Sequence, residues 1–142
     1  MLALVLASYG AVYFSQQTST LQSENDYLRS RLGSVSDAVN VGIDFGNGTR
    51  LWYNGTYVPV DSSVFNATYI STGGRLTTQV YSFGNASEVF VTGILGLSGN
   101  SSSYWLWFYF DNLTHQWTEA AVGADSFMVM QGGTYLWNYI RG

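Results

Sequence analysis

Few side chains in this sequence could carry out chemistry, and only one of them is a histidine. His115 has Asp111 and Glu119 four residues to either side. A histidine with two carboxylates can hold a metal ion loosely, but histidine-based metal sites repeat the residue at short spacings such as HxH or HxxxH. His115 therefore reads as a solvated turn residue, and we predict neither a metal site nor a cofactor.

The other residue types that support catalysis form no recognisable motif. The nine acidic residues are scattered, and no pair stands out as a general acid and base. The segment GLSGN at 96–100 misses the Gly-x-Ser-x-Gly pattern of a nucleophile elbow, and no glycine-rich phosphate loop occurs. There is no cysteine, which excludes disulfides, thiolate metal sites and thiol nucleophiles. We predict no catalytic residues and a function other than catalysis.

Composition limits the class of partner. The 142 residues suit one ordinary domain plus an extra element. The chain has five arginines and no lysine, and its net charge is -4, so it lacks the basic footprint that binds nucleic acid. With 46% hydrophobic and only 10% charged residues, something besides charge has to keep it in solution.

Asparagine usage supplies that second source of solubility. Six of the nine asparagines lie in the acceptor pattern for N-linked glycans, about three times what the serine and threonine content would give by chance. We predict an extracellular, glycosylated domain that carries N-linked glycans at Asn47, Asn54, Asn66, Asn85, Asn100 and Asn112.

The chain begins with a hydrophobic segment, MLALVLASYGAVYF. Fourteen residues are short for a membrane-spanning helix, which needs about 20, and no positively charged region precedes them as in a secretory leader. Three interpretations stay open at this stage. The segment is a membrane stalk, an assembly helix that packs on other subunits, or a cleaved leader.

A helical stripe continues from this start into a polar region. Positions spaced by three and four residues are apolar except for Thr18 and Asn25. Such a stripe is expected where one helix packs along another. We predict a long N-terminal helix and stalk over 1–38, whose assembly face consists of Leu4, Ala7, Ala11, Phe14, Leu21, Leu28 and Leu32.

From residue 39 the apolar period changes from 3.6 to 2, which predicts strands. Val39 to Phe45 alternates, a hairpin turn follows at 46–49, and the chain returns at 51–53, with a second turn expected at Asn54-Gly55. A short helix over 64–70 follows polar capping residues and ends at Gly73-Gly74. Further strands are expected at 76–80, 89–91, 104–110, 116–118, 127–129 and 135–139.

The run Tyr104 to Phe110 is apolar on both faces of its predicted strand. Such a strand is normally central, between a helix and another layer or a partner protein. One face carries Trp105, Trp107 and Tyr109, and the alternate residues form the other. We predict that the domain's helix buries one face, and that Trp105, Trp107 and Tyr109 form a contact surface for a partner.

Several segments together resemble a known family. VGIDFGNGT, VDSSVFNAT, VFVTGILGL, SYWLWFY and VGADSFMVMQGGTYLWNY, in this order over about residues 39–142, are similar to the DUF4430 family. That family is also related to the C-terminal domain of transcobalamin and intrinsic factor. The resemblance implies a β-grasp-like domain, with one short helix on a small mixed sheet, displayed outside the cell behind a signal or anchor. It implies no catalytic residues.

The expected architecture is therefore α+β, with a long N-terminal helix (1–38) followed by a β-grasp-like domain (39–142). The first functional hypothesis is a glycosylated, non-enzymatic cell-surface protein whose N-terminal helix packs into a pilin-like filament core or a membrane complex, with itself or with other subunits. The alternative is a membrane-anchored module that binds a small ligand, such as a flat aromatic, corrinoid-like or carbohydrate molecule.

Overall fold

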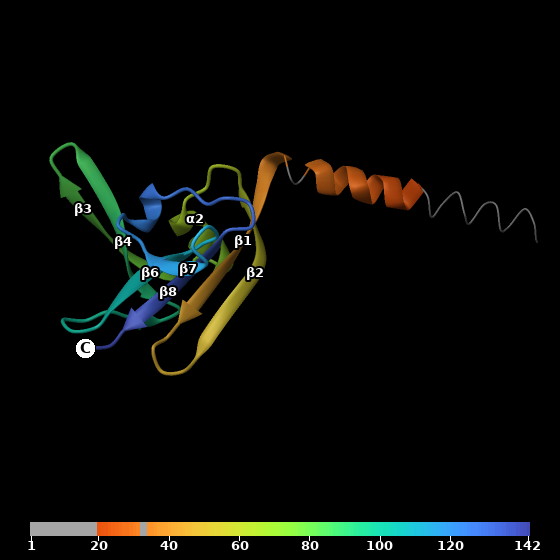
Figure 1. Ribbon diagram of the computed structural model, residues 1–142. Coiled ribbons are helices and arrows are strands. Elements are labelled where there is room, and N and C mark those ends of the chain that lie inside the picture. The colour runs from red at the N-terminus through yellow and green to blue at the C-terminus, as the bar shows by residue number, and fades with distance from the viewer. Residues whose placement is uncertain (1–19, 32–33) are drawn as a thin grey trace, which may run out of the picture. The chain divides into compact units, whose positions relative to one another are not determined.

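Figure 1 shows the computed structural model of the chain, in which residues 20–31 and 34–142 are described. The chain divides into two units, Met1–Val35 and Ser36–Gly142. The second unit, called the β domain below, begins with the first strand at Ser36.

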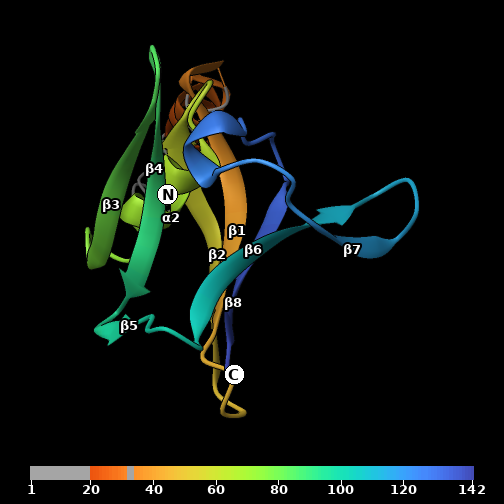
Figure 2. The same ribbon diagram turned by 90° about the vertical axis from the view of Figure 1, so that its left-hand side faces the viewer.

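The β domain contains a five-stranded sheet with the strand order β2-β1-β8-β6-β7. Its members are β1 (Ser36–Asp44), β2 (Arg50–Pro59), β6 (Tyr104–Asp111), β7 (Gln116–Glu119) and β8 (Thr134–Ile140). All pairs are antiparallel except β1 with β8, which run parallel in the middle of the sheet. The first and last strands of the domain are therefore neighbours (Figure 2).

A second sheet of three strands has the order β3-β4-β5. It is built from β3 (Leu76–Phe83), β4 (Ala86–Ile94) and the two-residue β5 (Leu97–Ser98). A two-residue turn joins β3 and β4, and its first residue, Gly84, has a φ of 62° that suits glycine. In Figure 2 this hairpin rises beside the larger sheet, with β3 on the outside.

The helix α2 (Val64–Ser71) contributes to the core beside one face of the five-stranded sheet. Ser63 caps it, because its hydroxyl accepts a hydrogen bond from the Asn66 N–H at 3.1 Å. Gly73 and Gly74 follow the end of the helix, both have positive φ, and their N–H groups bond back to carbonyls of its last turn. One core joins the helix to both sheets and includes Val41, Ala67, Ile94 and Trp137.

The predicted fold class is wrong in two respects. The β domain is mostly strand and contains two sheets, where one small mixed sheet was expected. Alternation along a strand indicates which side is apolar but not which strand is its neighbour, so it could not show that β3 and β4 leave the main sheet.

The second error concerns the long N-terminal helix, which the structure does not show. Helical residues are described only at 20–31 and 34–35, and all of them are exposed. A helix with no buried face depends on local hydrogen bonds alone, so a continuous apolar stripe does not ensure its length. Of the predicted assembly face, Leu21 and Leu28 are described, while Leu4, Ala7, Ala11, Phe14 and Leu32 lie outside the described residues.

Two local predictions also need correction. Asn54-Gly55 is a bulge inside β2, because the register shifts opposite it and the Gly55 N–H bonds to Asn40 Oδ1 at 3.0 Å. The segment 127–129 is an irregular chain with one isolated bridge between Ser63 and Met128, preceded by the short η1 turn (Ala124–Ser126).

Within the described residues, no helix is long and apolar enough to cross a membrane.

Candidate binding groove

Trp105 and Trp107, the main residues of the predicted contact surface, point into the core. Their exposed fractions are 7% and 6%, and their indole N–H groups donate to the carbonyls of Leu97 and Val122 at 2.9 and 3.1 Å. Tyr109 is half-buried and stacks on Phe127 with ring centroids 5.2 Å apart. These three side chains therefore cannot form an open surface, and that prediction has to be corrected.

The physical reason is the direction of the pleat. Both faces of β6 are apolar, so the sequence could not indicate which face meets the rest of the core. Trp105 and Trp107 share their face with the core residues of β8, Tyr139 and Trp137, to which they are directly paired. The alternate residues, beginning with the exposed Tyr104, lie on the other face.

A groove opens where the β3–β4 hairpin diverges from the start of β6. It has a volume of about 900 Å³, and we call it the aromatic groove. Its lining comes from β3, β4, the segment between β5 and β6, and the first residues of β6. The lining residues are Thr78, Gln79, Tyr81, Phe83, Phe90, Val91, Thr92, Ser98, Gly99, Asn100, Ser103, Tyr104, Trp105 and Leu106.

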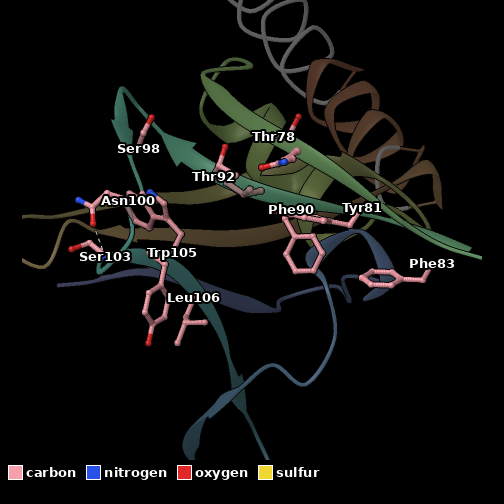
Figure 3. A pocket seen from close by; sticks show the side chains of 14 residues that line it. Thr78, Tyr81, Phe83, Phe90, Thr92, Ser98, Asn100, Ser103, Trp105 and Leu106 are labelled. Carbon is pink, nitrogen blue, oxygen red and sulfur yellow. Dashed lines mark hydrogen bonds between the residues drawn. The ribbon is translucent and has the colours of Figure 1, made fainter. Parts of the chain in front are cut away.

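Aromatic rings from both sides face this space. In Figure 3, Phe83 and Phe90 project from the hairpin, and Trp105 lies across from them. Tyr81 and Phe90 support each other in a T-shaped contact with ring centroids 5.0 Å apart. Trp105 is held by its bond to Leu97 and by the Tyr139 ring at 5.0 Å, so it forms a firm floor. The groove thus offers both fixed and solvent-exposed rings.

The polar part of the groove is uncharged. None of its lining residues is acidic or basic; they offer hydroxyls and the amide of Gln79. Asn100 Oδ1 accepts the N–H groups of Ser102 and Ser103 at 2.9 Å each, which fixes the segment before β6. A neutral molecule with a flat apolar face and polar groups at its rim matches this chemistry.

A smaller hollow of about 310 Å³ lies farther along β6, beside β4 and residues 120–124. Asp125 helps to hold β4 there, because its Oδ2 accepts the Val89 N–H at 3.0 Å. The other carboxylate oxygen of Asp125 is buried and has no hydrogen-bond partner among the described residues. Asp125 therefore positions β4 next to the loop that precedes β8.

His115 lies in the turn between β6 and β7 and has a φ of 55°. Asp111 Oδ1 is used by the same turn, where it accepts the Leu113 N–H at 2.9 Å. In the part of the chain that the structure describes, no three side chains of histidine, aspartate or glutamate gather into a group that could hold a metal ion.

Five predicted glycan acceptors, Asn47, Asn54, Asn85, Asn100 and Asn112, are exposed. Asn66 differs, since it is half-buried on α2 and its Nδ2, the atom that would carry a glycan, donates to Ser62 Oγ at 3.1 Å. The hydroxyl residue of the same acceptor pattern, Thr68, is fully buried. The folded domain thus presents five accessible acceptors and one that is closed.

The groove itself was not predicted. Its aromatic residues Tyr81, Phe83 and Phe90 lie on strands expected only as 76–80 and 89–91, and no motif marks them. The alternation of Gln79, Tyr81 and Phe83 shows that they share a face of β3. Only the angle between the two sheets turns that face into one wall of a groove.

Solved structures show which fold this is. The structure of haptocorrin in complex with Cbi matches 75% of this chain with a TM-score of 0.60 and 18% identity, and the chain spans 25% of that protein. A candidate metal-binding protein from Ruminococcus gnavus matches 75% of this chain and 98% of its own, with a TM-score of 0.54 and 14% identity. The fold is therefore related to that of part of haptocorrin.

Comparison of the sequence itself gives no match. No known protein family matches it, and neither does any curated protein. The relation rests on three-dimensional structure, at a sequence identity that indicates the fold alone.

Proposed function

We propose that this chain is a non-enzymatic, glycosylated cell-surface protein whose β domain binds a small neutral molecule in the aromatic groove. The observation that carries the proposal is the lining of this groove, in which the exposed rings of the hairpin, the exposed Tyr104 and the buried Trp105 border about 900 Å³ without a charged side chain. Such a site favours ligands with a flat apolar face, because stacking contributes without the cost of desolvating a charge. The ligand classes it suits are corrinoid-like molecules and carbohydrates.

The fold relation supports a binding role, since haptocorrin was solved in complex with Cbi. A closer relation to the DUF4430 family, drawn from the segments between residues 39 and 142, is part of the same proposal. So are the location outside the cell and attachment through the N-terminal segment. Five exposed acceptors for N-linked glycans are consistent with that location.

The test is calorimetric titration of the full chain with two probes, Cbi and a neutral oligosaccharide. We expect one of them to bind, and Tyr104→Ala or Phe83→Ala to weaken that binding about tenfold, because each change removes one exposed stacking face. Tyr57→Ala is the matched control, since Tyr57 is an exposed aromatic residue on β2 outside the groove.

Unchanged affinity in both groove variants, or an equal loss in the control, would contradict binding in the groove. If neither probe binds at millimolar concentration, neither of these ligand classes is the occupant and the proposal fails. Each variant should also unfold at the same temperature as the wild type. This control ensures that a loss of affinity comes from the site and not from a damaged fold.

A second role, assembly through the N-terminal helix, is favoured by a separate observation. Leu21 and Leu28 are 66% and 59% exposed on the described helical residues, one above the other at the spacing of two turns. A filament core or a membrane complex would bury such a stripe, formed with copies of the chain or with other surface subunits.

The double variant Leu21→Gln/Leu28→Gln tests this second role. Mass photometry of the native glycosylated protein should show assemblies that the double variant loses, while Ser30→Gln, on the opposite side of the helix, keeps them. Monomers in all three samples would exclude assembly through this stripe.

A further inference from the structure

The outer strand of the smaller sheet, β3, has an open edge that is protected by none of the usual devices. Natural edge strands carry charges, proline or bulges, or are very short, because unpaired backbone groups template pairing with another chain. β2 has Arg50, Pro59 and the bulge at Asn54-Gly55, while β7 has four residues and ends in Glu119. β3 carries no charge and no proline, and the one register shift of its pair with β4 places the extra residue, Thr92, on β4.

The direction of the free backbone groups follows from one hydrogen bond. Val80 is directly opposite Val89 of β4, and the Val89 N–H donates to Asp125 on the side away from β3. In an antiparallel pair, two directly opposite residues have one of two arrangements. Either they exchange backbone hydrogen bonds with each other, or the N–H and C=O groups of both residues point away from the partner strand. The N–H and C=O of Val80 therefore face the open edge, and alternation adds those of Thr78 and Ser82.

The side chains along this edge are exposed. Val80 is 60% exposed, and all the residues from Thr77 to Phe83 are exposed. Because β3 has no charged residue, it offers no opposite charge to attract a charged strand. For the same reason it does not repel an identical strand. The strand is thus electrostatically compatible with a copy of itself.

We propose that β3 pairs with β3 of a second copy of this chain, antiparallel and about a two-fold axis at Val80. In this register Val80 faces its own counterpart, and Thr78 faces Ser82 of the other copy. The three outward residues then exchange about six backbone hydrogen bonds, with a valine pair at the centre and a Thr–Ser pair at each side. The two smaller sheets become one continuous sheet.

A pairing of this size is weak by itself. One strand contact buries less than the roughly 1,000 Å² that marks a stable interface, so it forms at the high local concentration of a cell surface. It also leaves the groove face of the hairpin open, because Tyr81 and Phe83 project from the sheet and not along its edge. The pairing is therefore a property of the β domain, separate from the N-terminal helix, and of its three outward residues only Thr78 also lines the groove.

The absence of cysteine permits a direct test in the full-length chain. In Val80→Cys the two thiols meet at the axis, where Cα atoms about 5.5 Å apart allow a disulfide. In the control Ser82→Cys, the cysteine of one copy faces Thr78 of the other copy. The two cysteines are then offset by about four residues along the strands, or about 13 Å, which is beyond disulfide reach. Both residues are exposed, so neither change disturbs the core.

We expect mild oxidation to link Val80→Cys into dimers at least fivefold faster than Ser82→Cys, as measured on non-reducing gels. Leu113→Cys, in the exposed turn before β7, gives the background of random collision and keeps the acceptor pattern of Asn112. Dimers of Val80→Cys at this background rate would overturn the pairing, and faster linking of Ser82→Cys would overturn the register.

The same measurement separates this proposal from assembly through the helix. Val80→Cys in the Leu21→Gln/Leu28→Gln background should still form the disulfide, because the axis lies in the β domain. Loss of the cross-link in that background would show that the helix, and not β3, brings the copies together. It would then overturn independent pairing of β3.

Discussion

At the scale of single residues, the core depends on polar contacts as well as apolar packing. Thr68 on α2 is fully buried, donates to the Val64 carbonyl at 2.8 Å, and accepts the indole N–H of Trp137 at 2.8 Å. This hydroxyl is the only partner of that indole N–H among the described residues. It joins the helix to the central strand of the sheet.

Thr68→Val keeps the shape of the side chain but leaves the Trp137 N–H buried without an acceptor. We expect the free energy of unfolding to fall by about 1–3 kcal/mol, the usual cost of an unsatisfied buried donor. Urea denaturation of the protein without glycans measures it. Thr118→Val on β7, whose hydroxyl has no described hydrogen bond, should change stability by less than about 0.5 kcal/mol. Equal effects would contradict the role of the hydroxyl.

Asp44, at the end of β1, gives a prediction about pH. Burial alone would raise the pKa of its carboxyl, but hydrogen bonds from the Gly46 N–H and from Arg50, with the Arg50 charge, together hold the pKa below the ordinary value of 3.8. The ionised form is therefore favoured in the folded state. Its contribution is present above pH 3.8 and is lost as the pH falls through the lower folded pKa.

We expect Asp44→Asn to be less stable than the wild type by about 0.5–1 kcal/mol at pH 7, since Arg50 is 47% exposed and solvent screens its ion pair with Asp44. The difference should shrink as the pH is lowered from 7 to below 3.8 in a series of urea titrations. A difference that stays constant over this range would show that the contribution of Asp44 is not electrostatic.

At the scale of elements, the close contacts of β1 come from a glycine in its middle. A Cβ at Gly42 would lie 2.7 Å from the Trp52 ring and 2.9 Å from Leu136. Trp52 from β2 thus lies over β1, where its ring is 6.3 Å from that of Trp117 on β7. Glycine lets one aromatic side chain cross the face of the sheet opposite the core.

Gly42→Ala should push the Trp52 ring away from β1 and destabilise the domain by about 1–3 kcal/mol, as overpacking does. The near-ultraviolet circular dichroism of the tryptophans should change with it. The double variant Gly42→Ala/Trp52→Ala should recover part of the loss, because the clash has been removed. No recovery would indicate that the strain arises at Leu136 instead.

Elements were more predictable from the sequence than their assembly. The hairpin after Phe45, the helix after Ser63 and the strand over Tyr104 to Phe110 all occur, because local turn chemistry and periodicity decide them. The pairing of β3 with β4 as a separate sheet depends on contacts distant in sequence. The sequence could not indicate which face of β6 meets the core, since both faces are apolar. The groove depends on that face and on the angle between the two sheets, so it could not be predicted either.

At the scale of the whole molecule, glycans and fold have to be compatible. Five acceptors are exposed, but Asn66 is tied to Ser62 and its partner residue Thr68 is buried under Trp137. If the chain is glycosylated as proposed, mass spectrometry should find glycans at Asn47, Asn54, Asn85, Asn100 or Asn112 and none at Asn66. A glycan at Asn66 in correctly folded protein would contradict the packing of α2.

The parallel pairing of β1 with β8 has a consequence for biosynthesis. The centre of the main sheet joins residues 40–44 to residues 134–138, so its closure waits until β8 has been translated, about 90 residues after β1. Until then, the aromatic strand β6 has no inner neighbour on its β8 side. Folding of this domain must follow the synthesis of β8, and a nascent chain truncated before β8 should remain a substrate for chaperones and proteases.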